Sequence, residues 1–237
     1  GSDTAAVTIV VNDELPVIAY SPNAFTLTKG TAMTTVTPTT SGGAIVSWSI
    51  SPTLPTGLAF DTSTGAISGT PTVLSVSTAY TVTATNTGGS DTAAVTIVVN
   101  DALPVITYSP SSFTLTKGTA MTTVTPTTSG GAIVSWSISP TLPTGLVFDT
   151  STGAISGTPT VLSVSTAYTV TATNTGGSDT AAVTIVVNDE LPVIVYSPSS
   201  LTLTKGTAMT TNTPTVSGGA IVSWSISPTL PTGLAFD

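Results

Sequence analysis

The chain has 237 residues, with 11 acidic side chains against three lysines and no arginine, which gives a formal net charge of −8. This charge leaves no basic surface for a nucleic acid or for an anionic membrane. Histidine and cysteine are absent, which removes most catalytic triads, zinc sites and thiol nucleophiles, so we predict that the chain is not an enzyme.

A period of 88 residues organises the whole sequence. Residues 1–88 recur as 89–176 with five substitutions, and a third copy runs from 177 to 237. A fixed period of this kind indicates tandem copies of one structural unit. We predict domains at 14–101 and 102–189, with 1–13 as the last strand of one truncated repeat and 190–237 as the truncated first half of another. These ends are expected to be partly ordered or to pair with a neighbouring chain through open strand edges.

Within each unit, the predicted elements are strands in which apolar and polar residues alternate. In chain order, the strands of the first unit are expected at residues 25–28, 46–51, 80–85 and 95–99. Period-two alternation places apolar side chains on one face and threonine or serine on the other, as in antiparallel sheets with one wet face. Glycine and proline break these runs at short intervals. The pattern predicts an all-β chain of tandem immunoglobulin-like antiparallel β-sandwiches with an 88-residue period.

Several residues are predicted to have defined structural roles. Trp48 lies in an apolar stripe with Val46 and Ile50, in the manner of the core tryptophan of an immunoglobulin sandwich. Tyr80 opens a late strand where a tyrosine corner is expected. Between the strands, Asp61 is expected to bind backbone amides of its own turn, and the following Gly65 to adopt the left-handed conformation that closes a hairpin.

Residues 54–71 read LPTGLAFDTSTGAISGTP, which resembles the signature of the bacterial putative-Ig repeat, a family related to dystroglycan-type cadherin-like domains. Residues 80–86 and 95–99 agree with the same pattern. The resemblance covers 15–101 and 103–189 and recurs up to residue 237. The family is known mostly as modular parts of large extracellular proteins, so the resemblance implies an extracellular location at a bacterial cell surface.

No catalytic, cofactor-binding or metal-binding residue is assigned. The main site hypothesis is calcium at the borders between repeats, because residues 12–16, NDELP, are similar to the linker of cadherin repeats. Calcium requires about six to eight oxygen ligands, and Glu14 becomes Ala102 at the next border. We therefore favour solvated acids and local turns there. Lys29 precedes Gly30 and is expected as a surface turn residue, not as the buried lysine of an isopeptide cross-link.

The function expected from these features is a structural spacer or stalk of a large, adhesin-like extracellular bacterial surface protein, projecting a distal module. Each unit should add roughly 35–45 Å, and short proline-containing joints favour stiffness. The expected partners are neighbouring repeats in the same chain, and any glycan or cell-surface ligand is expected elsewhere in the full protein. Two alternatives remain: a multivalent adhesive module that binds a glycan or surface ligand, and an accessory domain of a secreted polysaccharide-degrading enzyme.

Overall fold

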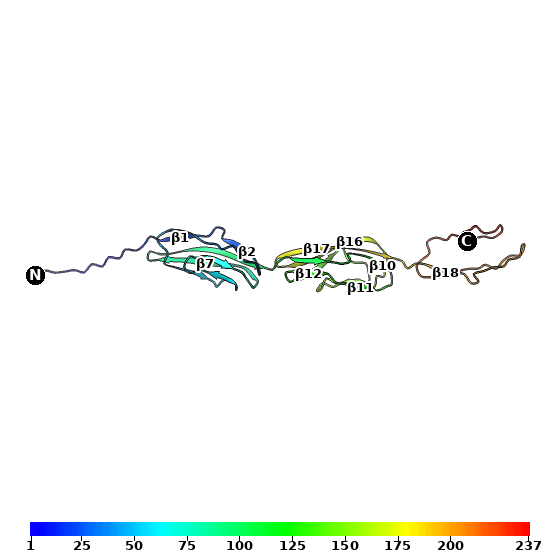
Figure 1. Cartoon of the computed structure of the whole chain (residues 1–237), viewed down its shortest axis with the longest axis horizontal. Helices are drawn as coiled ribbons and strands as arrows, with labels where there is room; N and C mark the ends of the chain where they lie inside the picture. The colour runs from blue at the N-terminus through cyan, green and yellow to red at the C-terminus, as the bar shows by residue number, and fades with distance from the viewer. The chain divides into compact units, whose positions relative to one another are not determined.

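The computed structural model describes all 237 residues, and its regular elements are strands joined by turns (Figure 1). The predicted all-β class is therefore confirmed. No helix that could cross a membrane is present. Two sandwiches follow one another along the chain, the first built from β1–β8 and the second from β9–β17.

The first sandwich has eight strands, of which the last two are much longer than the others. They are β1 (Pro16–Ala19), β2 (Ala24–Thr28), β3 (Thr39–Gly42), β4 (Ser47–Ser51), β5 (Leu58–Phe60), β6 (Ile67–Gly69), β7 (Ser75–Asn86) and β8 (Gly89–Asn100). The second sandwich has nine strands, because β11 is added to the same order: β9 (Pro104–Thr107), β10 (Ser112–Thr116), β11 (Met121–Val124), β12 (Thr127–Gly130), β13 (Ser135–Ser139), β14 (Leu146–Phe148), β15 (Ile155–Gly157), β16 (Ser163–Asn174) and β17 (Gly177–Asn188).

One layer of the first sandwich is a four-stranded sheet with the order β2-β8-β7-β4. The other layer contains the antiparallel pairs β1·β3 and β5·β6, and Val36 bridges to Ile67 beside them. The second sandwich has β10-β17-β16-β13 as its four-stranded layer, and in its other layer β11 joins β15 and β14 in a three-stranded sheet where the first sandwich has only the Val36 bridge. In the first sandwich, pairing is antiparallel except between β2 and β8, which are parallel, as are their equivalents β10 and β17 in the second. The alternation of the sequence gave no sign of this exception.

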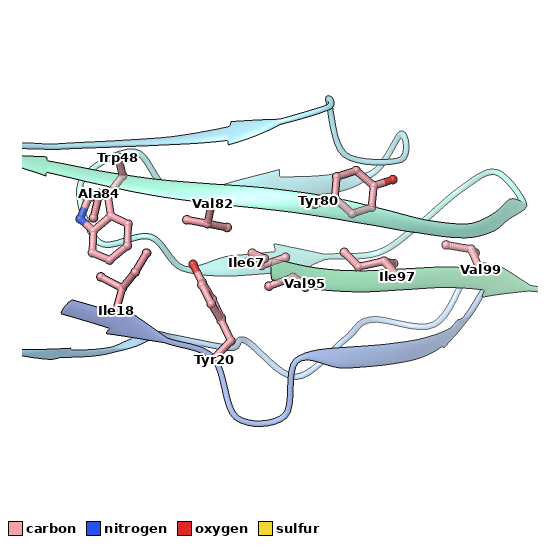
Figure 2. Packing of buried hydrophobic residues seen from close by; sticks show 10 residues of the cluster. All are labelled: Ile18, Tyr20, Trp48, Ile67, Tyr80, Val82, Ala84, Val95, Ile97 and Val99. Atoms are coloured by element: carbon pink, nitrogen blue, oxygen red, sulfur yellow. The ribbon is translucent and has the colours of Figure 1, made fainter. Parts of the chain in front are cut away.

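The core lies between the layers, and the inward stripes of the two long strands supply most of it (Figure 2). It is formed by Ile18, Tyr20, Trp48, Ile67, Tyr80, Val82, Ala84, Val95, Ile97 and Val99, all buried. Full burial of a valine or isoleucine side chain stabilises a fold by about 1.5–3 kcal/mol relative to exposure. The predicted stripes in 80–85 and 95–99 and the core position of Trp48 are confirmed. Val46 was predicted in the same stripe, yet it lies just outside β4 and is 73% exposed, so the alternation continues beyond the edge of the core.

At the two ends of the chain, segments that match sandwich strands in sequence lack the neighbouring strands with which those strands pair. Residues 1–13 form no strand, although residues 1–12 have the same sequence as β8. In the sandwich, that sequence lies between β2 and β7, and both partners are missing around residues 1–12. Residues 190–237 contain β18 (Val193–Val195) paired with β19 (Thr215–Ser217) and lack counterparts of β6, β7 and β8. Trp224 is consequently 43% exposed, whereas Trp48 is 8% exposed.

Candidate functional site

The segment that leads into the first sandwich is held by the turn between β7 and β8. The side chain of Asn86 is buried, and its Nδ2 donates a hydrogen bond to the backbone oxygen of Glu14 over 2.7 Å. Its Oδ1 accepts from the backbone amides of Gly88 at 2.9 Å and Gly89 at 3.1 Å. The buried amide therefore holds the turn and the incoming chain together. Asn174 does the same in the second sandwich, where its Nδ2 binds the backbone oxygen of Ala102.

The border acid Asp13 is held by the same turn. Its backbone amide donates to Thr87 Oγ1 at 3.1 Å, and that hydroxyl donates back to Asp13 Oδ2 at 2.7 Å. The next residue, Glu14, contributes its backbone oxygen to this anchor and not its side chain. This explains why alanine at the equivalent position 102 preserves the anchor.

The opposite end of the first sandwich is closed by Lys29. Its backbone amide donates to the oxygen of Asn100 at 2.8 Å, and its Nζ lies 3.5 Å from Asp101 Oδ1. The lysine side chain is 45% exposed, as expected for a surface turn residue. An isopeptide cross-link requires a buried lysine, so this position does not suit one.

The borders between repeats show no group of side chains that would support a calcium site. Nowhere in the chain do three or more acidic, histidine or cysteine side chains gather into a possible metal site. The carboxylate of Asp101 faces the Lys29 ammonium, and that of Asp13 accepts the Thr87 hydroxyl. Since calcium requires several oxygen ligands around one point, these separate acids act as local hydrogen-bond and ion-pair partners.

Two polar side chains connect β1 and its end to the rest of the sandwich. Asp91 reaches from β8 and accepts a hydrogen bond from the backbone amide of Ile18 at 2.8 Å. Tyr20 follows β1, and its buried hydroxyl donates to the backbone oxygen of Gly65. Burial raises the pKa of the Tyr20 phenol to about 12.

The tyrosine-corner prediction for Tyr80 is wrong. Tyr80 is buried as a core residue, at 3% exposure, but its hydroxyl makes no hydrogen bond to a backbone oxygen. The tyrosine that holds a carbonyl is Tyr20, which projects into the core from the other layer (Figure 2). Nothing in the sequence favoured Tyr20, because its partner Gly65 lies 45 residues away in the chain. The position of Tyr80 in a late strand therefore decided the prediction.

The hairpin prediction for the DTSTG turn is confirmed. Asp61 Oδ1 accepts the backbone amide of Ser63 at 2.8 Å, and Gly65 has a φ of +72°. Hydrogen bonds from Ser63, and then from Thr64, lower the pKa of Asp61 to about 2. The turn lies against the core tryptophan, because a Cβ added to Gly65 would stand 2.7 Å from the Trp48 ring.

An apolar groove opens between β2 and residues 33–37, with a volume of about 520 Å³. Phe25, Leu27 and Met33 are among the residues that line it, and an equivalent groove of about 480 Å³ occurs in the second sandwich. None of the lining residues carries an ionisable side chain. Its serine and threonine hydroxyls therefore have no acid or base among the lining residues that could activate them.

Sequence reasoning missed three residues that organise each sandwich, namely Tyr20, Asn86 and Asp91. A weak signal existed for Asp91, because it is a charged residue on the inward-facing side of a strand and such a residue requires a partner. Asn86 and Tyr20 gave no comparable signal, because their main partners lie 72 and 45 residues away.

Comparison with known families agrees with this architecture. The sequence profile described as "Putative Ig domain" matches residues 15–100 and 103–188. The chain belongs to the putative Ig domain family. Its two matched segments are the two sandwiches described above.

Curated relatives of these Ig domains carry the name "Serine-rich adhesin for platelets". The protein from Staphylococcus aureus is 32% identical over 192 residues, which are 76% of this chain and 7% of that protein. The protein from strain MRSA252 is also 32% identical over 192 residues, 12% of its length. The chain thus spans only a small part of these relatives.

Solved structures with a similar fold include extracellular domains 3–5 of Drosophila OTK, at 17% identity and a TM-score of 0.44, over 73% of this chain and 62% of that one. The eight N-terminal Ig domains of the Down Syndrome Cell Adhesion Molecule align at 14% identity and a TM-score of 0.43, over 79% of this chain and 29% of that one.

Proposed function

We propose that these Ig domains are spacer repeats of a large bacterial surface protein and that they project a distal module away from the cell. The observation that carries the proposal is the path of the chain through one sandwich. It enters beside Gly88 and Gly89, at the start of β8, and leaves after Asn100, at the end of the same strand. A strand of 12 residues spans about 40 Å at roughly 3.3 Å per residue. The points where the chain enters and leaves one sandwich are therefore separated by about the length of its longest strand.

The chemistry of the repeats supports the same role. The outward-facing positions of β4 and β7 are mainly serine and threonine, and no cluster of metal-binding or catalytic side chains accompanies them. Such a surface keeps a repeated module soluble without offering a reaction site.

We propose that the repeats are not enzymes, contact neither nucleic acid nor membrane directly, and have neighbouring repeats as their main partners. Their proposed limits are 14–101 and 102–189, with 1–13 and 190–237 belonging to further repeats.

The proposal is tested by varying repeat number. Small-angle X-ray scattering of chains with two, four and six sandwiches should show a maximum dimension that increases by roughly 35–45 Å per repeat. A maximum dimension that levels off as repeats are added would contradict a spacer.

A second candidate function has a specific observation in its favour, namely the name of the staphylococcal relatives, which describes adhesion to platelets. In this alternative, each repeat carries a weak site for a glycan or surface ligand and many repeats act together. Binding of fluorescent one-repeat and six-repeat chains to platelets and to glycan arrays separates the candidates. An adhesive module requires retention that increases steeply with repeat number, whereas a spacer shows no retention at any length.

A further inference from the structure

A small pocket opens beside the core tryptophan of the first sandwich. It has a volume of about 470 Å³ and lies between β3, the segment 43–45 that follows it, and the DTSTG turn. Small-molecule sites in proteins usually measure about 300–1,000 Å³. The walls are mostly threonine, serine and glycine, and no ionisable side chain lines them.

The indole of Trp48 places a hydrogen-bond donor at this pocket. Trp48 is 8% exposed, and its Nε1 has no hydrogen-bond partner within the chain. No fully buried side-chain nitrogen lacks a partner, so this nitrogen reaches solvent. Figure 2 shows it on the side of the ring that faces away from Val82. A nearly buried indole N–H usually has a partner. Because Trp48 lines the pocket, its donor is open to a molecule bound there.

Hydroxyl groups line the same pocket. Thr40 lies opposite Ile18 in the β1·β3 pair, and residues directly opposite each other share one face of a pair. Thr40 therefore points to the side of the buried Ile18. The hydroxyls of Thr37 and Thr40 make no hydrogen bond within the chain. Each is free to donate to a ligand and to accept from it.

The DTSTG turn adds a hydroxyl of fixed direction. Ser63 Oγ donates to Asp61 Oδ1 at 2.5 Å, and the Ser63 amide donates to the same oxygen at 2.8 Å. The hydroxyl proton of Ser63 is thus committed to the carboxylate, and the lone pairs of Oγ remain as acceptors. The pocket therefore combines one fixed donor, one fixed acceptor and two hydroxyls that can do either.

This inventory selects an uncharged ligand that both donates and accepts hydrogen bonds. No cationic side chain lines the pocket to balance an anion, and the nearby Asp61 carboxylate already accepts from Ser63. Sugar hydroxyls donate and accept at every position, as the pocket requires.

We propose that the pocket of Trp48, Thr37, Thr40 and Ser63 binds one unit of a neutral saccharide, with the Trp48 N–H donating to a sugar oxygen. This site goes beyond the spacer function, and it is the kind of site that the adhesive alternative requires.

The repeats provide a built-in comparison. Residues 125–133 have the same sequence as residues 37–45, and Trp136 is also 8% exposed with no partner for its Nε1. In the third copy, Val216 occupies the position of Thr40, and Trp224 is 43% exposed. We therefore expect Trp48 and Trp136 to respond to a saccharide and Trp224 not to respond.

The test follows the three indole N–H groups by NMR in the complete chain labelled with ¹⁵N-tryptophan. Each signal is assigned by replacing one tryptophan with phenylalanine. The probes are the methyl glycosides of glucose, galactose, mannose and N-acetylglucosamine at millimolar concentrations. The signals of Trp48 and Trp136 should shift and saturate with at least one of them. No shift with any probe, or an equal shift of the Trp224 signal, would overturn the proposal.

Thr40→Val tests the pocket without disturbing the core, because Thr40 is exposed and valine is well suited to a strand. Loss of one hydrogen bond should weaken the affinity measured at Trp48 by about threefold to tenfold. The affinity measured at Trp136 in the same molecule should not change. Thr39→Val is the matched control, since the Thr39 hydroxyl bonds to the backbone oxygen of Ala19 and does not line the pocket. Equal weakening by the two variants would contradict the site.

Failure of this proposal can be distinguished from failure of the spacer function. The scattering test of repeat number does not involve the pocket, so each proposal can fail while the other stands. Retention of six-repeat chains on a glycan array without movement of the Trp48 signal would assign adhesion to another surface and overturn the pocket.

Discussion

The hydroxyl of Tyr20 donates a hydrogen bond to the backbone oxygen of Gly65. This bond joins the end of β1 to the DTSTG turn, and the same turn lies against the indole of Trp48. One buried hydroxyl thus couples the first strand of the sandwich, the β5–β6 hairpin and the core tryptophan. The second sandwich contains the equivalent bond from Tyr108 to Gly153.

Replacement of Tyr20 and Tyr108 by phenylalanine should lower the free energy of unfolding by about 1–3 kcal/mol per sandwich, because a buried carbonyl loses its donor. Guanidinium denaturation followed by tryptophan fluorescence measures the change. Tyr80→Phe with Tyr168→Phe is the matched control, since Tyr80 is equally buried but its hydroxyl binds no backbone oxygen. A control as destabilised as the test variant would contradict the role assigned to the bond.

The same tyrosines predict a loss of stability at alkaline pH. Burial raises the pKa of Tyr20 and of Tyr108 to about 12 in the folded chain, from 10.0. The unfolded chain therefore releases these protons first. The associated stability is complete below pH 10 and decreases as the pH rises toward 12, by up to about 1.4 kcal/mol per pH unit and tyrosine. Thermal denaturation from pH 8 to 12 should show this decline, and the Tyr20→Phe/Tyr108→Phe chain should show a shallower one.

Gly65→Ala should destabilise the first sandwich through both its backbone and the core tryptophan. The position has a φ of +72°, and the new Cβ would stand 2.7 Å from the Trp48 ring. Alanine at positive φ costs about 1 kcal/mol, and displacement of the packed indole adds about 1–3 kcal/mol. Gly30→Ala is the control, because its φ is +80° and nothing lies within 4 Å of its added Cβ. Similar denaturation midpoints for the two variants would show that the Trp48 contact is unimportant.

Asn86→Ala should detach the incoming chain from the β7–β8 turn. The substitution removes one donor and one acceptor from a buried site, so we expect a loss of about 2–3 kcal/mol and faster amide exchange at Gly88 and Gly89. Glu14→Ala should leave stability nearly unchanged, because the Asn86 side chain binds only the backbone oxygen of that residue. Hydrogen-exchange mass spectrometry with denaturation measures both. Unaltered exchange in the Asn86 variant would rule out the anchor.

The strands that could be predicted are those with long alternation and no competing pattern. β7 and β8 carry alternating apolar residues in 80–85 and 95–99, so their inward faces and the core position of Trp48 were accessible from sequence. β1 was missed because a four-residue strand beginning at Pro16 is too short to show a period. The parallel direction of β2 was also inaccessible, since period-two alternation is the same in either direction.

The anchoring contacts were harder to predict for a different reason. The DTSTG hairpin was predictable because Asp61, Ser63 and Gly65 interact within one turn. Asn86 and Asp91, in contrast, bind residues more than 70 positions away. Such contacts depend on which strands become neighbours across the sandwich, and no local feature of the sequence reports that.

The sequence GSDTAAVTIVVN occurs three times, as residues 1–12, as β8 and as β17. Any of the three copies fits equally well between a β2-type strand and a β7-type strand, because its side chains are the same. After unfolding, a strand from one repeat can therefore refold into another, which is domain swapping between neighbours. Arrays of such closely matched repeats should recover from denaturation with a fraction of misassembled molecules that increases with the number of copies.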